Sequence, residues 1–109
     1  MSFAANLKAL PGIAHLAAVR LLDREGNEVA VIENKPGQAG SVAVYNHLGQ
    51  LYGAITPEAA KKGLELYDEH TADAQAHPGK HPNIDRLLTL IAEGATLRVK
   101  HVFAATILD

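Results

Sequence analysis

The sequence predicts one α+β domain, in which a three-stranded antiparallel sheet has helices packed on one face. Two observations favour this class. Apolar, β-branched stretches flank a turn near the N-terminus and recur near the C-terminus, and apolar stripes with spacings of three and four fill the region between them. The expected order of elements is α-β-β-α-α-α-β. Because 109 residues make one ordinary domain, residues 1–109 are expected to form a single unit.

The first elements are a short helix and a hairpin. Ser2 can cap a helix that ends before Pro11. Residues 13–22 are mostly apolar on both faces and predict a buried strand, and residues 28–34 predict a β-branched partner strand. Turn residues around Gly26 join the two, which predicts a hairpin.

Two helices are expected next. In residues 41–53 apolar side chains fall on one face at helical spacing, with Ser41 as the N-cap and Gly53 as the stop. Thr56, followed by proline and glutamate, starts a second helix whose apolar stripe continues to about Ala76.

A last helix and a last strand complete the domain. The helix starts near Asn83, shows the face Ile84, Leu87, Leu88 and Ile91, and ends at Gly94. Residues 96–103 then alternate, as a half-buried antiparallel strand does. Its two sides are expected to hold Leu97, Val99 and Phe103 against Arg98 and Lys100.

Composition narrows the classes of function. Ten Lys and Arg against twelve Asp and Glu give a net charge of −2, with no charged block, which argues against a nucleic-acid partner. There is no cysteine and no apolar run of the roughly 20 residues that span a membrane. We therefore expect a cytoplasmic protein with no membrane association.

The first candidate site is a cluster of histidines. His70, Asp73 and His77 are three and four residues apart on a predicted helix, and His81 can fold back across the following Pro-Gly turn. Imidazole and carboxylate are ligands of zinc, nickel and iron(II), so these four residues are a candidate metal site, although their spacing matches no named motif. The alternatives are a helix end where Asp73 neutralises a histidine, or a histidine that acts as a general base.

The second candidate site is a pair of loops, residues 34–41 and 77–83. Each places a lysine and Pro-Gly turn chemistry beside the N-terminus of a helix, where unpaired N–H groups attract anions. The alternative is that both loops are simple turns. If the loops meet, the candidate ligand-binding residues are Lys35, Gly37, Ser41, Lys80 and His81.

The C-terminal residues bear on partners. Ile107 and Leu108 make the end of the sequence apolar, whereas a free end is normally polar. A three-stranded sheet also leaves exposed edges. Both features favour docking of this segment, on the same subunit or in a homodimer.

The stretch from His77 to Leu87, HPGKHPNIDRL, is the most distinctive part of the chain. With NKPGQAGS and VYNHL at their spacing, the chain resembles a family of small, uncharacterised proteobacterial proteins classed as a domain of unknown function, from about Leu10 to Val102. The resemblance implies a bacterial cytosolic setting, and it brings with it no activity, cofactor or catalytic residue.

The leading functional hypothesis from the sequence is a binding or interaction domain for a small anionic ligand or an acidic partner segment. A metal-binding protein or metal-dependent enzyme that uses residues 70–81 is the first alternative. A structural homodimer, or a subunit of a larger complex, is the second.

Overall fold

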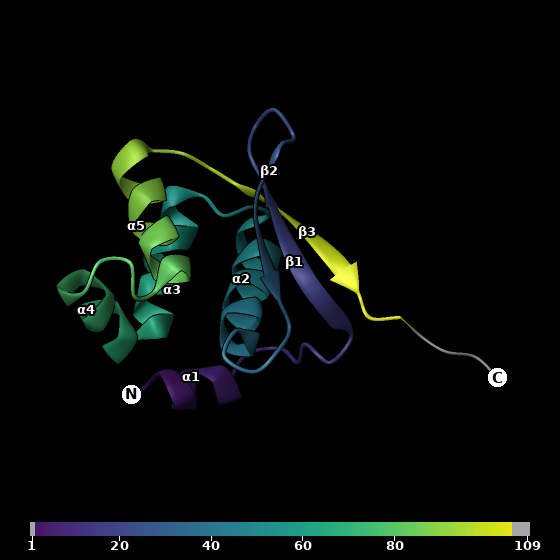
Figure 1. Cartoon of the computed structure of the whole chain (residues 1–109), viewed down its shortest axis with the longest axis horizontal. Coiled ribbons are helices and arrows are strands. Elements are labelled where there is room, and N and C mark those ends of the chain that lie inside the picture. The colour runs from purple at the N-terminus through teal and green to yellow at the C-terminus, as the bar shows by residue number, and fades with distance from the viewer. Residues whose placement is uncertain (1, 106–109) are drawn as a thin grey trace.

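The computed structural model describes residues 2–105 and confirms the predicted α+β fold and its order of elements. The sheet has the order β2-β1-β3, with antiparallel neighbours throughout (Figure 1). The elements are α1 (Phe3–Lys8), β1 (Leu16–Leu22), β2 (Glu28–Glu33), α2 (Ala39–Tyr52), α3 (Pro57–Tyr67), α4 (Glu69–Ala76), α5 (Pro82–Glu93) and β3 (Arg98–Phe103). Within the described residues, no helix has the length and apolar character needed to cross a membrane.

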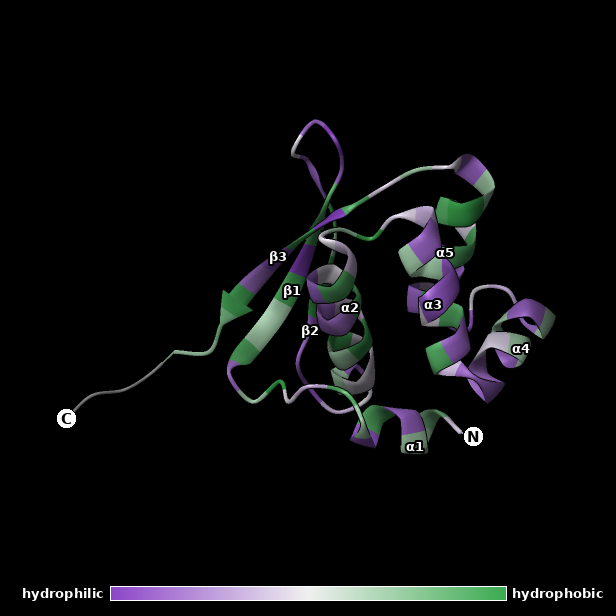
Figure 2. Cartoon of the chain, turned by 180° about the vertical axis from the view of Figure 1, so that it is seen from behind, coloured by the Kyte–Doolittle hydropathy of each residue, from purple (hydrophilic) through white to green (hydrophobic). Residues whose placement is uncertain are grey.

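The helices cover one face of the sheet, as the alternation of side chains predicts. Val19 pairs with Ile32 in β2 and with His101 in β3, and these side chains face α2. On the opposite face, Arg20 pairs with Val31 and Lys100. Figure 2 shows α2 lying against the sheet, with α3, α4 and α5 grouped beyond it. One side of the sheet is therefore core, and the other is a solvated, partly basic surface.

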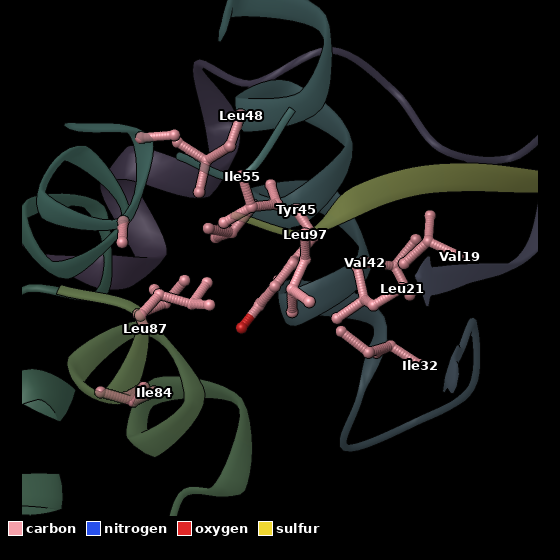
Figure 3. Packing of buried hydrophobic residues seen from close by; sticks show 14 of the residues in the cluster. Val19, Leu21, Ile32, Val42, Tyr45, Leu48, Ile55, Ile84, Leu87 and Leu97 are labelled. Atoms are coloured by element: carbon pink, nitrogen blue, oxygen red, sulfur yellow. The ribbon is translucent and has the colours of Figure 1, made fainter. Parts of the chain in front are cut away.

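Tyr45 lies at the centre of the core. Its side chain, on α2, lies between the sheet residues and the α5 residues Ile84 and Leu87 (Figure 3). A buried hydroxyl needs a hydrogen-bond partner, and that of Tyr45 donates to the backbone carbonyl of Asn83 at 2.6 Å. This bond fixes the start of α5 against the middle of α2.

The helix expected to run unbroken from Thr56 to Ala76 is two helices, because the chain turns at Asp68. Asp68 has φ 51° and ψ −115°, a conformation that a residue with a β-carbon rarely adopts. Side chains donate to carbonyls near the break: the Thr71 hydroxyl donates to Leu64 O at 2.6 Å, and the Asn6 amide donates to Leu66 O at 3.0 Å. Thr71 therefore makes a polar contact at the break.

One further detail of the sequence prediction is wrong. Ser41 is not the N-cap of α2, because the helix begins two residues earlier with Gln38 in the capping position. Phe103 keeps the predicted side of β3, because its ring stacks on that of His101 with centroids 6.4 Å apart, but it is 68% exposed. The predicted docking of Ile107 and Leu108 falls outside the described residues.

We predict that Asp68→Gly raises the free energy of unfolding by about 1 kcal/mol, since glycine adopts this backbone conformation without the strain of a β-carbon. Denaturant unfolding followed by circular dichroism measures the change. The matched control is Lys61→Gly on the exposed side of α3, which should lower stability by about 1 kcal/mol. Destabilisation by both changes would contradict the strain at Asp68.

Candidate functional site

The two loops singled out in the sequence line one open-sided cavity of about 700 Å³. Gly37 and Ser41 reach it from the first loop, and Lys80 and His81 from the second. Lys35 does not line it; its ammonium pairs with Glu33 at 2.9 Å. Four of the five candidate ligand-binding residues thus share a cavity, although the loops are some forty residues apart in the sequence.

Both helices that follow these loops begin at the cavity. The first turn of α2 is held against β2, because the side-chain carbonyl of Gln38 accepts the N–H of Glu33 at 3.1 Å. In this turn, no backbone partner within the described chain takes the N–H groups of Gly40 and Ser41. The first turn of α5, which includes Asn83, is fixed by Tyr45. The cavity therefore lies where two positive helix ends approach each other.

Helix α1 forms an apolar wall of the cavity. The ring of Phe3 stacks on Tyr67 and meets His70 edge-on, with ring centroids 5.1 Å apart in each case. Its backbone N–H donates to Glu69 Oε1 at 2.7 Å. A β-carbon at Gly40 would lie only 3.1 Å from the Phe3 ring, so the glycine allows this close packing. This role of Phe3 could not be predicted from the sequence, because the contact depends on tertiary structure.

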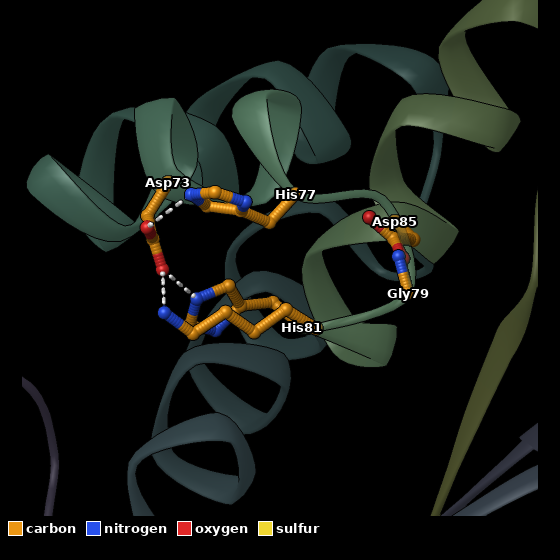
Figure 4. A network of polar contacts seen from close by, with 6 residues as sticks. Asp73, His77, Gly79, His81 and Asp85 are labelled. Atoms are coloured by element: carbon orange, nitrogen blue, oxygen red, sulfur yellow. Dashed lines mark hydrogen bonds and ion pairs between the residues drawn. The ribbon is translucent and has the colours of Figure 1, made fainter.

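The histidine-rich turn is organised by Asp73 (Figure 4). Its Oδ2 accepts a hydrogen bond from His81 Nε2 at 2.6 Å and lies 2.9 Å from the Lys80 ammonium. The hydrogen bond from His81, followed by that from Lys80, lowers the pKa of Asp73 to about 2. The carboxylate therefore stays ionised at neutral pH and holds both side chains at the edge of the cavity. This matches the alternative in which Asp73 neutralises a histidine.

The four residues considered for metal binding do not converge on one point. His77 Nε2 lies 3.9 Å from Asp73 Oδ1, and the ring of His70 faces Phe3 and His81. Among residues 2–105, no three His, Asp or Glu side chains form a group able to hold a metal ion. The Lys80 ammonium already contacts Asp73 Oδ2, an oxygen that would have to bind the metal ion. This geometry gives the metal hypothesis no support.

Arg86, on α5, is a site residue that the sequence analysis did not identify. Its guanidinium donates to Asn83 Oδ1 at 2.9 Å and to the Tyr45 hydroxyl at 3.2 Å, and lies 5.7 Å from the centre of the Tyr45 ring. No carboxylate in the described part of the chain lies within ion-pair distance of it. The cavity thus has a half-buried cation held in place by neutral groups.

The hydroxyl groups beside the cavity are arranged for hydrogen bonding. Tyr67 donates to Ser41 Oγ at 2.7 Å. Burial raises the pKa of Tyr67 well above its ordinary value and that of Tyr45 to about 12. Both phenols therefore remain protonated near neutral pH. Ser41 has a hydrogen-bond donor beside it rather than a base, which does not activate a nucleophile.

Fold and site together define a small α+β domain with a basic cavity between two helix starts. Residues 3–101 match the model of the family described as uncharacterized protein conserved in bacteria (DUF2322), and the chain belongs to this family. The match starts closer to the N-terminus than the resemblance noted in the sequence, so it includes the α1 residues beside the cavity. Comparisons with curated proteins and with solved structures gave no match.

We predict that Asp73→Asn removes a pH-dependent part of the stability. Because the folded-state pKa of Asp73 is lowered from 3.8 to about 2, its contribution is fully present above about pH 4 and is lost as the pH falls through 2. The variant should melt below the wild type at neutral pH, and the difference should shrink on acidification. Thermal unfolding across this range measures it. Glu93→Gln is the surface control, and its melting temperature should change with pH as that of the wild type does. If both variants changed the pH dependence of the melting temperature alike, the prediction would be contradicted.

Proposed function

We propose that this protein is a binding domain that takes an anionic group, a phosphate or a carboxylate, into the cavity between α2 and α5. The observation that carries the proposal is the charge of the lining. Lys80 and Arg86 supply positive charge, His70 and His81 supply imidazole rings, and among the described residues that line the cavity there is no carboxylate. An anion placed there gains attraction from Arg86 without displacing an existing ion pair.

The size and the remaining walls of the cavity support a binding role. A volume of about 700 Å³ lies within the range of sites that hold small organic ligands. Phe3, Leu7 and Ile84 supply apolar surface, and the amides of Gly40 and Ser41 supply donors. A ligand that joins an anionic group to an apolar portion fits this combination.

The polar groups favour binding over catalysis. Ser41 accepts a hydrogen bond from a protonated phenol, and Asp73 is engaged by His81 and Lys80. A nucleophile with an adjacent base would be the signature of covalent catalysis. We therefore infer a non-enzymatic module. Its cytoplasmic location and its assembly into a homodimer remain predictions from the sequence.

We predict that inorganic phosphate binds weakly in this cavity and that Arg86→Met reduces its affinity about tenfold, as expected when one charge-assisted hydrogen bond is lost. NMR titration should show the largest shifts at the amides of Gly40 and Ser41. Lys80→Met should weaken binding less, because Asp73 already neutralises much of this charge.

Lys35→Met is the matched control, since Lys35 belongs to the same loop but pairs with Glu33 outside the cavity. Its affinity for phosphate should equal that of the wild type. Equal losses in the Lys35 and Arg86 variants would indicate general surface attraction and contradict a site. Absence of any shift at Gly40 and Ser41 would also do so.

A further inference from the structure

The space between β2 and α5 is hollow along its length. At one end lies the basic cavity, to which Val31 contributes from β2. At the other end lies a second cavity of about 680 Å³, with Val29 on its strand side and Thr89 on its helix side. Arg86 lines both cavities, so they adjoin. Together they form a groove with a strand edge on one side and a helix on the other.

The backbone of β2 presents free hydrogen-bonding groups to this groove. Asn34 N–H donates to Ala17 O at 2.8 Å, which makes the next pair, Ala18 with Glu33, a non-hydrogen-bonded one. Alternation then gives the same character to Arg20 and Val31, so both the N–H and the C=O of Val31 point away from β1. No other backbone partner for them occurs in the described chain.

The edge is closed only at its end. The outward N–H of Glu33 donates to the Gln38 side chain, and its C=O accepts the N–H of Lys35 at 3.0 Å. Val31 and Val29, by contrast, are 44% and 50% exposed. Exposed strand edges are normally blocked by charge, proline or a covering element. An apolar, unpaired edge inside a groove is therefore suited to receive another strand.

The two ends of the groove carry opposite charge. The lining of the α2 end has Lys80 and Arg86 and no carboxylate among the described residues. The lining of the hairpin end has two arginines, Arg24 and Arg86, and three carboxylates, which belong to Asp23, Glu25 and Glu93. A strand lying in the groove would meet this charge difference along its length, and the difference selects its direction.

We propose that the groove binds an extended segment of another protein, which adds to the sheet as a strand antiparallel to β2. This rests on the proposed anion site, whose occupant becomes an acidic side chain of that segment. One residue of the segment pairs with Val31. The residues before and after it point to the helix side, because neighbours in a strand alternate. An acidic residue before it then lies near Arg86, and a basic residue after it lies near Glu93.

The test uses a dye-labelled, acetylated and amidated peptide, Thr-Val-Glu-Val-Arg-Val-Thr, and its charge-swapped form, Thr-Val-Arg-Val-Glu-Val-Thr. Fluorescence anisotropy with the full chain should show binding of the first that is about tenfold tighter than that of the second. The first peptide should also protect the Val31 amide from hydrogen exchange. Equal binding of the two peptides, or no binding of either at millimolar concentration, would overturn the proposal.

Val31→Pro tests the backbone pairing on the strand edge. The substitution removes an N–H that makes no bond to β1, and proline is tolerated at such edge positions. Peptide affinity should fall about tenfold or more relative to Val31→Thr. Val31→Thr, which keeps the N–H, is the control. Unchanged peptide affinity in the Val31→Pro variant would overturn strand addition. If the wild-type protein does not bind inorganic phosphate, the anion site itself is overturned.

A modified peptide gives the same test without altering the protein. Methylation of the backbone nitrogen of its central valine removes the N–H that would donate to Val31 O. The methylated peptide should bind at least about tenfold more weakly than the parent. Unchanged affinity would overturn the backbone pairing, whatever the effect of proline on folding.

Discussion

The hydrogen bond from Tyr45 to the carbonyl of Asn83 is the constraint on which the site depends. The Tyr45 ring is fully buried, and a buried hydroxyl without a partner would cost roughly 1–3 kcal/mol. That requirement places the first turn of α5 against the middle of α2, and the first turns of both helices line the same cavity. Arg86, one helical turn further along α5, then brings its guanidinium to the same hydroxyl and to the Asn83 side chain. A packing requirement in the core thus positions a cation in the cavity.

The remaining walls follow from the break between α3 and α4. A continuous helix would carry residues 69–76 along the α3 axis, away from α1. The turn at Asp68 instead brings Glu69 to the N–H of Phe3 and the ring of His70 against the Phe3 side chain. It also lets Asp73 reach back to His81. The strained backbone at one residue therefore helps to hold α1, α4 and the start of α5 around the same cavity.

The sequence predicted what local patterns determine and missed what depends on packing. Alternation and helical spacing gave the fold and the order of elements, and turn chemistry located the loops that contain Lys80 and His81. Arg86 could not be found, because it lies in an ordinary amphipathic helix and matters only through Tyr45 and Asn83. The break at Asp68 carries no glycine or proline to indicate it. The position of Lys35 outside the cavity could not be predicted for a similar reason, because the sequence shows its place in the loop but not its ion pair with Glu33.

The charge of the lining and the unpaired edge of β2 together specify the direction of a bound segment, which neither feature specifies alone. An uncompensated arginine would suit any small anion, and an unpaired edge would suit any strand. The edge is open at Val31, however, only two residues from Glu33, where Gln38 closes it, and Val31 itself lines the basic cavity. A strand that pairs at Val31 must therefore place a neighbouring side chain beside Arg86. Because leaving that cation without a partner is costly in a half-buried position, an acidic residue there contributes more than its exposed counterpart would. The geometry couples recognition of backbone to recognition of charge, and this coupling distinguishes a specific partner segment from a free anion.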